Sequence, residues 1–495
     1  MSGHRYAESI DSIDASPTTP FFPGSRDSSS QHPKGPLWRR YRQSLLLLAV
    51  FSLLSLTSFV LYTLPDAQLQ VPGRTSFGST FNDPRSPRLR ALVGPPTVRF
   101  RDNLRNDTKY ITSWISAGWT NDVMTYANLI YLGLITGRTA ILHTFLPSHV
   151  GPGAPQIPFS DVFDIEYLSE KIGMPVLEFS DVKNMSTASE EIEEIGCWSV
   201  WEAVELREGR PRPVYTEWEQ GLSISWTTAP PWVKKIPDYE HDRFARFWDL
   251  AVLTYPKGRQ ENLGTPQPSR TGATVHPDEH LVCFDYLYYA CASTSDEFIR
   301  EHSPAWRDVL RYFRWAPRMQ EIADGYLRRM FGVAETDPIP PYITIHARRG
   351  DFGAYCGFAN LTLGDCFPTM EDYARGIVGI RKELEQRLGI SPKHIVMVSD
   401  EKDSIWWEVV RIMGWYTPDH EAEQTVERYG AWRVSVRMYP VFIDAVIQSS
   451  GVGLLGSPGS TMSIIAGRRV IDWHGGAYHN VPWKVCSFSC WKNLS

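Results

Sequence analysis

The segment HARRGDF, residues 346–352, carries the side chains best suited to phosphate chemistry. It continues the apolar run YITI, so a strand should end here, and His346 and Arg348 share one face because they lie two residues apart. An arginine fork is always charged and donates two hydrogen bonds to phosphate oxygens. Alternatively, Arg348 pairs with Asp351 and holds a loop, and the strand pattern alone does not decide. An integrin-binding role for the tripeptide 349–351 is disfavoured by its place directly after a core strand.

A second candidate is GSPGSTMSIIAG, residues 456–467, in which a short strand pattern leads into a helix. Helix N-termini present free N–H groups and the positive end of the dipole. Ser460 and Thr461 would add hydroxyl donors there, which predicts a diphosphate cradle. The alternative is plain N-capping by Ser460. A Walker loop is excluded because no G-K-[ST] is present.

A third candidate is SAGWTND, residues 116–122. Gly118 permits close backbone approach. Asn121 stands where a helix begins, so it could either cap that helix or meet a phosphate, and capping is the simpler role. Taken alone, this turn is weak evidence for a ligand.

The chain contains no D-x-D sequence. Sugar-nucleotide transferases that depend on a metal commonly hold it through clustered carboxylates. An enzyme without them must stabilise a leaving diphosphate with arginine, hydroxyl groups and helix dipoles. The three segments above supply such groups, so we expect no bound metal and no cofactor.

Two α/β units must position these segments. In the first, a strand is expected at Lys109–Ile115, a helix at Val123–Leu134 closed by Gly137, and a strand at Thr139–His143. Residues 145–280 are rich in proline and irregular, which predicts long loops or insertions. Residues 298–331 are helical by pattern, with interruptions at two prolines.

The second unit follows the prolines at 338–341 and alternates strands with helices, so a parallel sheet covered on both faces is expected. Ligands of such sheets bind beyond the carboxyl ends of the strands. The fold class is therefore α/β, with two Rossmann-like domains facing a cleft. The expected elements are strands at 342–347, 394–400, 452–456 and 469–472 and helices at 371–388, 403–413, 439–450 and 460–466.

These segments together resemble the GDP-fucose protein O-fucosyltransferase superfamily. The run IHARRGDF is similar to its H-x-R-x-G-D region, and the turn from Gly118 to Asn121 resembles its G-x-x-N element. GSPGSTMS looks like its Ser/Thr-rich element, and Asp444 with Gln448 resembles a further block. The likeness covers roughly residues 110–473. The sequence departs from the family in its first glycine turn, where Ala117, Trp119 and Thr120 replace the usual aromatic and basic residues.

The resemblance implies a GT-B-like fold, GDP-fucose as the donor substrate, and metal-independent transfer with inversion to a hydroxyl of a protein or glycan acceptor. Arg348, the catalytic candidate, would stabilise charge on the leaving phosphate. A non-catalytic luminal protein that binds glycans or nucleotides on the same fold is the alternative. The implied GDP-fucose-binding residues are Gly118, Asn121, His346, Arg348, Asp351, Asp444, Ser460 and Thr461.

A membrane anchor is predicted at residues 44–64, a run of 21 residues without a charge. Its length suits a bilayer crossing, and the basic residues before it predict a cytosolic N-terminus. A cleaved signal peptide would have a shorter apolar region. The expected location is the ER or Golgi membrane, with a luminal catalytic domain. The expected organisation is a disordered tail at 1–43, the anchor at 44–64, a stem at 65–100, an acceptor-side domain at 101–334 and a nucleotide-sugar domain at 335–495.

Seven cysteines and several sequons suit an oxidising lumen. The close pairs Cys283/Cys291, Cys356/Cys366 and Cys486/Cys490 could form disulfides, leaving Cys197 alone, although sequence does not fix connectivity. Candidate glycosylation sites are Asn106, Asn184 and Asn360, and a further sequon lies at Asn493. The net charge of −6 argues against a general nucleic-acid-binding surface.

Overall fold

The computed structural model describes residues 86–146, 156–188, 191–205, 209–239, 242–294, 297–299, 303–358, 360–425 and 439–483. These residues belong to one compact unit of the chain. Within these ranges, no helix combines the length and the apolar character that a membrane crossing requires. The predicted tail, the anchor at 44–64 and most of the predicted stem lie outside them.

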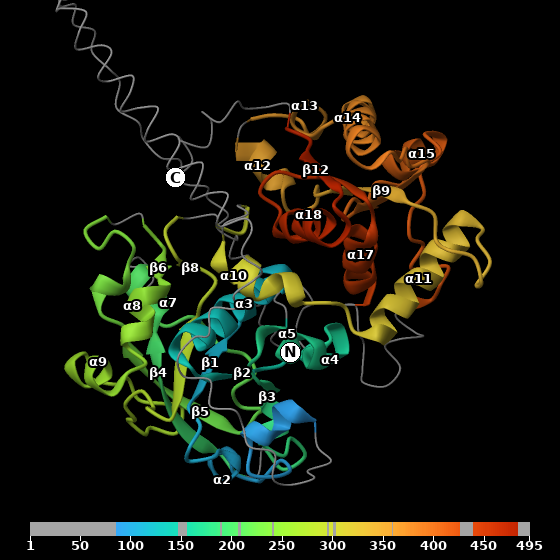
Figure 1. Ribbon diagram of the computed structural model, residues 1–495. Helices are drawn as coiled ribbons and strands as arrows, with labels where there is room; N and C mark the ends of the chain where they lie inside the picture. The colour runs from blue at the N-terminus through green and yellow to red at the C-terminus, as the bar shows by residue number, and fades with distance from the viewer. Residues whose placement is uncertain are drawn as a thin grey trace, which may run out of the picture. The chain divides into compact units, whose positions relative to one another are not determined.

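A six-stranded parallel sheet forms the first half of the described chain, in the order β3-β2-β1-β7-β4-β5 (Figure 1). Its central strands are almost wholly buried, which is typical of a parallel sheet covered on both faces. The strands are β1 (Tyr110–Trp114), β2 (Thr139–Leu142), β3 (Val176–Glu178), β4 (Glu193–Ser199), β5 (Leu222–Thr228) and β7 (Leu281–Tyr286).

Alternate side chains of these strands enter two different cores, because successive residues of a strand point to opposite faces. Ile111 and Val282 pack in the larger core with helix α3 (Trp119–Thr136), whereas Tyr110 and Leu281 pack in a smaller core on the other face. Gly137 ends α3 in the left-handed conformation, with φ +65°. The helix is longer than its predicted extent of 123–134 because Gly118 caps it at the end of the SAG turn.

The proline-rich stretch 145–280 is more regular than its composition predicts. It contains β3, β4 and β5, so the prediction of long loops there is wrong for half of the sheet. The short helices of this half are α4 (Phe159–Val162), α5 (Ile165–Ile172), α6 (Phe179–Val182), α7 (Val200–Val204), α8 (Phe247–Val252) and α9 (Pro256–Glu261), and β6 (Ala245–Arg246) pairs with β8 (Ala290–Cys291).

The folded part also begins earlier than the sequence suggests. Pro87–Ala91 forms a 3₁₀ helix, η1, and Phe100–Asn103 forms helix α2. Leu92 and Phe100 are fully buried in the smaller core. The last part of the predicted stem at 65–100 is therefore packed against the first sheet.

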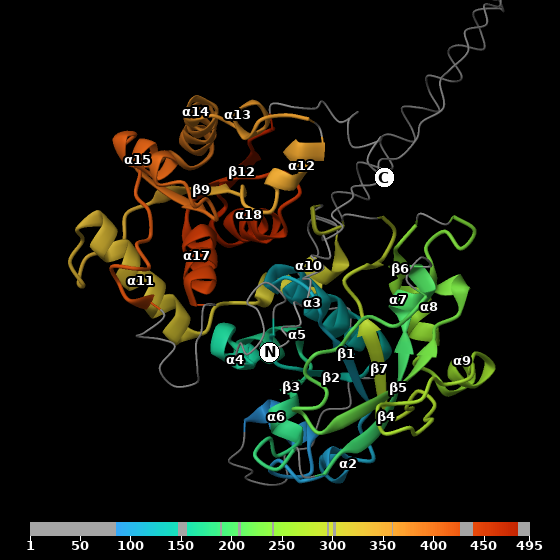
Figure 2. The ribbon, with the colours of Figure 1, turned by 180° about the vertical axis from the view of Figure 1, so that it is seen from behind.

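The second sheet has four parallel strands in the order β10-β9-β11-β12. Helices α14 and α15 cover one face and α17 and α18 the other (Figure 1 and Figure 2). The strands are β9 (Tyr342–Ala347), β10 (His394–Ser399), β11 (Gly453–Gly456) and β12 (Ala477–Asn480). Two helices, α10 (Pro304–Asp308) and α11 (Pro317–Phe331), lead to the second sheet. The helices that follow β9 are α12 (Gly353–Phe358), α13 (Leu363–Cys366), α14 (Met370–Leu388), α15 (Ser404–Ile412), α17 (Tyr439–Ser450) and α18 (Thr461–His474). Short 3₁₀ helices earlier in the chain are η3 (Pro231–Val233), η4 (Glu297–Ile299) and η5 (Leu310–Tyr312).

One predicted element of this half is wrong. The strand expected at 469–472 is the last turn of α18, and the final strand, β12, follows it at Ala477–Asn480. Residues 465–470 are all buried within the helix, and a short buried run does not distinguish a strand from a helix. Arg469 is among them: it is 1% exposed, and its guanidinium lies 4.3 Å from the ring centre of Trp315. Helix α18 ends instead at Gly475, which has φ +60°.

Two disulfides cross-link the described residues. Cys356 is bonded to Cys366, the pairing that their spacing suggested. Cys283 is bonded to Cys197 and not to Cys291, so that predicted pair is wrong, and Cys291 is a free buried thiol. Strands β4 and β7, which carry Cys197 and Cys283, are neighbours in the sheet although 86 residues separate the two cysteines.

The third predicted cysteine pair, Cys486 with Cys490, is not among these two disulfides. Both Cys486 and Cys490 lie outside the described residues, which end at 483. A bond between Cys486 and Cys490 therefore stays a prediction from their spacing. The sequon at Asn493 lies outside the described residues as well.

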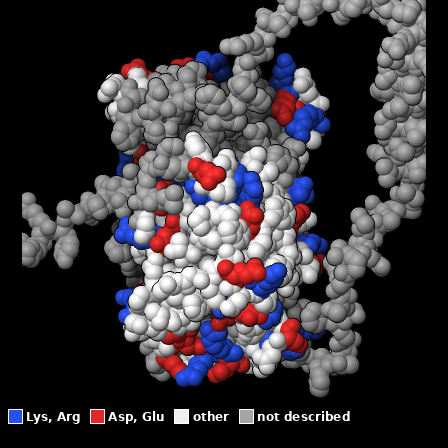
Figure 3. Space-filling model, turned by 90° about the vertical axis from the view of Figure 1, so that its left-hand side faces the viewer, with Lys and Arg blue, Asp and Glu red and all other residues white. Residues whose placement is uncertain are grey.

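Acidic and basic side chains are intermixed on the face seen in Figure 3, which belongs to the left-hand side of Figure 1. Among the described residues visible there, no broad field of one sign is seen. Such a surface fits the slightly acidic composition of the chain, with 50 basic and 56 acidic residues.

Candidate active site

The N-terminus of α18 brings together two of the three predicted phosphate-binding segments. Thr461, its first residue, donates a hydrogen bond of 3.0 Å from Oγ1 to Oδ1 of Asn121, at the start of α3. Asn121 follows β1 and Thr461 follows β11, so both stand beyond the carboxyl ends of parallel strands, where ligands of such sheets bind. The site therefore joins the two sheets at a contact between residues 340 positions apart.

A relay of hydroxyl protons orients the Asn121 carboxamide. Thr120 Oγ1 lies 2.5 Å from Thr461 Oγ1. Because the single hydroxyl proton of Thr461 goes to Asn121, Thr120 must donate to Thr461. Both threonine protons are then in use, whereas the Nδ2 group of Asn121 keeps its two donors. Thr461 is thus placed to position Asn121, and Asn121 to donate to a ligand.

Ser460 is the N-cap of α18, where its hydroxyl oxygen accepts from the Ser463 backbone N–H. This is the simpler of the two roles considered for it. The capping bond uses a lone pair of the oxygen, so the hydroxyl proton of Ser460 stays available to an acceptor. Ser460 is 5% exposed.

His346, near the end of β9, is tied to the same helix. Its Nδ1 lies 2.7 Å from Ser463 Oγ, which also accepts a 3.0 Å bond from the Ser457 backbone N–H. The Ser463 proton is therefore free to go to Nδ1, and we assign the imidazole proton to Nε2. Ser457 Oγ donates 2.9 Å to the His346 carbonyl and accepts 2.9 Å from the Arg348 backbone N–H. These bonds fix the end of β9 against the loop before α18.

The Arg348 guanidinium contacts two carboxylates. Nη2 lies 2.7 Å from Asp351 Oδ1, and Nη1 donates to Asp400 Oδ2. The ion pair with Asp351 that the sequence left open is therefore present. Only two of the five N–H donors are used by these bonds, and the side chain is 28% exposed. Arg348 is thus held in place, while three of its donors have no hydrogen-bond partner among the described residues and are available for an oxyanion.

Asp400, the residue after β10, organises this loop, and the sequence reasoning gave it no role. Its Oδ1 accepts from the backbone N–H groups of Arg349 and Gly350, at 2.7 and 3.0 Å. A Cβ on Gly350 would lie 2.7 Å from Asp400 Oδ2, so this close approach requires glycine. A carboxylate directly after a buried parallel strand next to β9 was the available signal.

The neighbouring arginine has a different environment. Arg349 Nε donates 2.5 Å to Glu401, and its guanidinium lies 4.7 Å from the ring centre of Phe367 and 5.2 Å from that of Trp406. Its charge is matched by one carboxylate and its faces are covered by rings. Arg349 is therefore a structural residue, which separates it from Arg348.

Asp444, a predicted binding residue on α17, lies apart from these contacts. Its Oδ1 lies 2.9 Å from His420 Nε2. Burial lowers the pKa of His420, but the charge and the hydrogen bond of Asp444 outweigh it, so the pKa is raised. No hydrogen bond in the described part of the chain joins Asp444 to Arg348, Asn121 or α18. One turn further along, both polar side-chain atoms of Gln448 are buried without a partner among the described residues.

Gly118 and Asp122 shape the first turn of α3. Asn121 N donates 2.9 Å to the Gly118 carbonyl, and the Ala117 backbone N–H donates 3.1 Å to Asp122 Oδ1. Asp122 is fully buried, and burial raises its pKa well above the usual range. Its second oxygen has no partner within the described residues. Gly118 thus serves as the backbone cap of the helix, with Asn121 one turn inside it.

The burial of His346 gives a pH dependence that can be measured. Burial, together with the Arg348 charge, lowers the pKa of this imidazole to about 4, although Asp400 opposes the shift. The unfolded chain binds a proton here below about pH 6.5, whereas the folded chain does so only near pH 4. The stability that the neutral, buried imidazole contributes is therefore complete above about pH 6.5 and is lost as the pH falls from there toward about 4. We expect the unfolding free energy of the wild type to fall more steeply than that of His346→Asn between pH 6 and 4.5, by about 1.4 kcal/mol per pH unit.

Urea unfolding of both proteins at three pH values in this window tests the expectation. Asp285 contributes in the opposite direction, since burial raises its pKa to about 6. It is present in both proteins, so the difference between their slopes isolates His346. Equal slopes would show that His346 is not buried as a neutral group.

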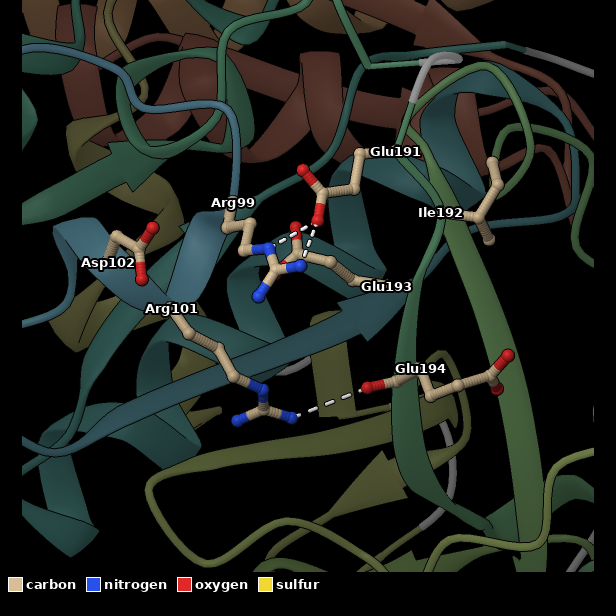
Figure 4. Close-up of a pocket in the computed structure, with 7 residues that line it drawn as sticks. All are labelled: Arg99, Arg101, Asp102, Glu191, Ile192, Glu193 and Glu194. Carbon is tan, nitrogen blue, oxygen red and sulfur yellow. Dashed lines mark hydrogen bonds and ion pairs between the residues drawn. The ribbon is translucent and has the colours of Figure 1, made fainter.

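A surface hollow elsewhere does not contain these residues (Figure 4). Its walls pair with each other: Arg99 with Glu191, and Arg101 Nη2 with the carbonyl of Glu194 at 3.4 Å. Because its carboxylates outnumber its arginines, the hollow is unsuited to a diphosphate. It is lined by Arg99, Arg101, Asp102, Glu191, Ile192, Glu193 and Glu194. Among the residues the structure describes, no group of three or more metal-ligating side chains is suited to hold an ion.

The chain is similar in structure to solved fucosyltransferase-like folds at low sequence identity. A crystal structure of POFUT1 in complex with GDP-fucose matches it with a TM-score of 0.45 and 15% identity, over 75% of this chain and 98% of that one. A complex of POFUT1 with GDP matches with a TM-score of 0.43 and 15% identity, over 76% and 99%. The fucosyltransferase NodZ from Bradyrhizobium matches with a TM-score of 0.36 and 13% identity, over 73% and 93%. No protein-family model and no curated protein matches the sequence.

Proposed function

We propose that this protein is a glycosyltransferase that transfers fucose from GDP-fucose to a hydroxyl group of a protein or glycan, with inversion and without a metal. The observation that carries the proposal is the 3.0 Å bond between Thr461 and Asn121. It unites two loops that the sequence offered separately as candidates for phosphate binding, with helix capping as the alternative for each. Arg348 and His346 are tied to the same helix N-terminus through Ser457 and Ser463.

The reaction would proceed by displacement at the sugar. An acceptor hydroxyl oxygen forms a bond to the anomeric carbon and gives up its proton to water, while the bond from that carbon to the diphosphate breaks on the opposite face and both its electrons stay on GDP. Negative charge then develops on GDP. Arg348 with its three unused donors, the Nδ2 group of Asn121, the Ser460 hydroxyl and the α18 dipole would stabilise that charge.

The location proposed for this activity is the lumen of the ER or Golgi, with residues 44–64 as the anchor. Disulfides persist in oxidising compartments, and the structure has two, Cys197–Cys283 and Cys356–Cys366. Asn106 and Asn360 are exposed, as glycosylation requires. Asn184 is partly buried, and its side-chain oxygen accepts bonds from Ser186.

One observation favours the second candidate, a non-catalytic binding protein. Arg348 is paired with two carboxylates, as an arginine with a purely structural role would be. A protein of this kind would bind a nucleotide or a glycan without turnover.

A transfer assay separates the two. Purified full-length protein is incubated with GDP-fucose labelled in the sugar, EDTA and a mixed pool of glycoproteins and free glycans. The proposal predicts label in the pool and release of GDP at a rate that EDTA does not change. Bound GDP-fucose without release of GDP would support the binding protein, and use of a UDP-sugar instead would overturn the donor assignment.

A further inference from the structure

Arg212 lies beside the first turn of α3 and has no ion-pair partner among the residues that the structure describes. Its Nη2 donates 2.9 Å to the carbonyl of Ser116, at the start of the turn that carries Gly118 and Asn121. The guanidinium lies 4.7 Å from the ring centre of Trp201 and 5.1 Å from that of Tyr286. Arg212 therefore belongs to the same sheet edge as Asn121, although it comes from the segment between α7 and β5.

No carboxylate among the described residues forms an ion pair with Arg212, and its Nε is buried without a hydrogen-bond partner among them. The Arg212 charge acts on the carboxyl of Asp122, which accepts from the backbone N–H of the residue after Ser116, Ala117. Burial raises the pKa of that carboxyl well above its usual range in spite of this charge, and no ion pair joins the two side chains. A half-buried charge without a counter-ion is costly unless a ligand supplies one.

The opposite side of the site has the reverse imbalance. Arg348 contacts both Asp351 and Asp400, so one positive charge faces two negative ones. Asn121, Thr461 and Ser460 are neutral. A nucleoside diphosphate that leaves from this site needs a further cation, and Arg212 contacts the turn that begins with Ser116 and leads to Asn121.

We propose that Arg212 binds a phosphate oxygen of the nucleoside diphosphate and supplies the positive charge on the first-sheet side of the site. The inference rests on the proposed function. The guanidinium has four N–H groups beyond the one given to Ser116, and a phosphate accepts such bonds in pairs. Cation–π contacts with Trp201 and Tyr286 and the bond to Ser116 restrict the guanidinium, which reduces the entropy lost when the phosphate binds.

The competing explanation is that Arg212 only braces the 209–221 segment against the Ser116 turn through its stacked rings. A brace would contribute to stability and leave nucleotide affinity unchanged. Its removal would also leave the salt dependence of binding unchanged.

The test is titration of full-length protein with GDP in EDTA, at several NaCl concentrations. Arg212→Gln is expected to raise the Kd for GDP about 10-fold and to flatten its dependence on salt. Arg212→Lys keeps the charge but loses the fork, so an intermediate Kd is expected. Arg210→Gln, an exposed arginine two residues away, removes the same charge and is the matched control.

Unchanged GDP affinity in Arg212→Gln, with or without a lower melting temperature, would overturn the inference in favour of the brace. An equal loss in Arg210→Gln would overturn it too, because general surface charge would then explain the effect. Failure of the wild type to bind any guanine nucleotide is a different result, since it defeats the proposed function itself.

Discussion

Replacing Arg348 with alanine is expected to lower fucose transfer about 100- to 1,000-fold, the usual effect of removing one donor to a developing oxyanion. The loss has two sources here. The variant removes three unused N–H donors, and it leaves Asp351 and Asp400 facing the departing diphosphate without their cation. The backbone bonds from Arg349 and Gly350 to Asp400 are retained, so the loop should keep its shape. The measurement is kcat/KM for GDP-fucose, together with a thermal melt.

Two further variants make this result specific. Arg348→Lys keeps the charge but not the planar fork, so activity between the alanine variant and the wild type is expected. Arg375→Ala removes an arginine that is 73% exposed and paired with Asp372. The kcat/KM of this variant should be close to that of the wild type. Near-normal transfer by a folded Arg348→Ala protein would refute the assignment of this site.

The second large effect concerns Asn121. Asn121→Ala removes the Nδ2 donors that the threonine relay orients, and we expect transfer to fall about 100-fold. Thr461→Val removes only the hydroxyl that holds the carboxamide and should cost about 10-fold, the value of one hydrogen bond. If Thr461 acts through Asn121, the double variant will be no worse than Asn121→Ala alone. Thr136→Val, at the far end of α3, controls for loss of a helix hydroxyl.

Additive losses in this cycle would contradict the relay. They would mean that Thr461 contacts the substrate itself, as the sequence alone suggested. A normal transfer rate in Asn121→Ala would show that Asn121 contributes only to the start of α3 and does not contact the substrate.

The strands and helices near the site were predictable because their patterns are local. The apolar run at 342–347 and the glycines at 137 and 389 mark β9 and the ends of α3 and α14 in the structure. Residues 145–280 were not readable in this way, although β4 and β5 are each seven residues long. The strand β4 begins with two glutamates and contains a glycine, and segments with prolines follow both strands. The Cys197–Cys283 bond follows from β4 lying beside β7, which no local spacing reveals.

The candidate site was partly predictable for the same reason. Arg348, Ser460 and Asn121 could be found because each stands where a strand gives way to a loop or helix. Asp400 also stands directly after a strand, but its bond to Arg348 spans 52 residues, and the bond from Ser463 to His346 spans 117, so the sequence did not show what either residue contacts. Asp444 was taken from a family likeness, and in the structure its carboxylate pairs with His420.

The central claim is that a guanine nucleotide binds where Asn121, Arg348 and the start of α18 meet. Thermal-shift titration of the full-length protein with GDP, GDP-fucose, UDP and UDP-sugars, all in EDTA, tests it most directly. We expect GDP and GDP-fucose to raise the melting temperature, by an amount equivalent to about 2.7 kcal/mol at 100 times Kd, and UDP compounds to have little effect. No shift with any guanine nucleotide, or a larger shift with UDP, would contradict the claim.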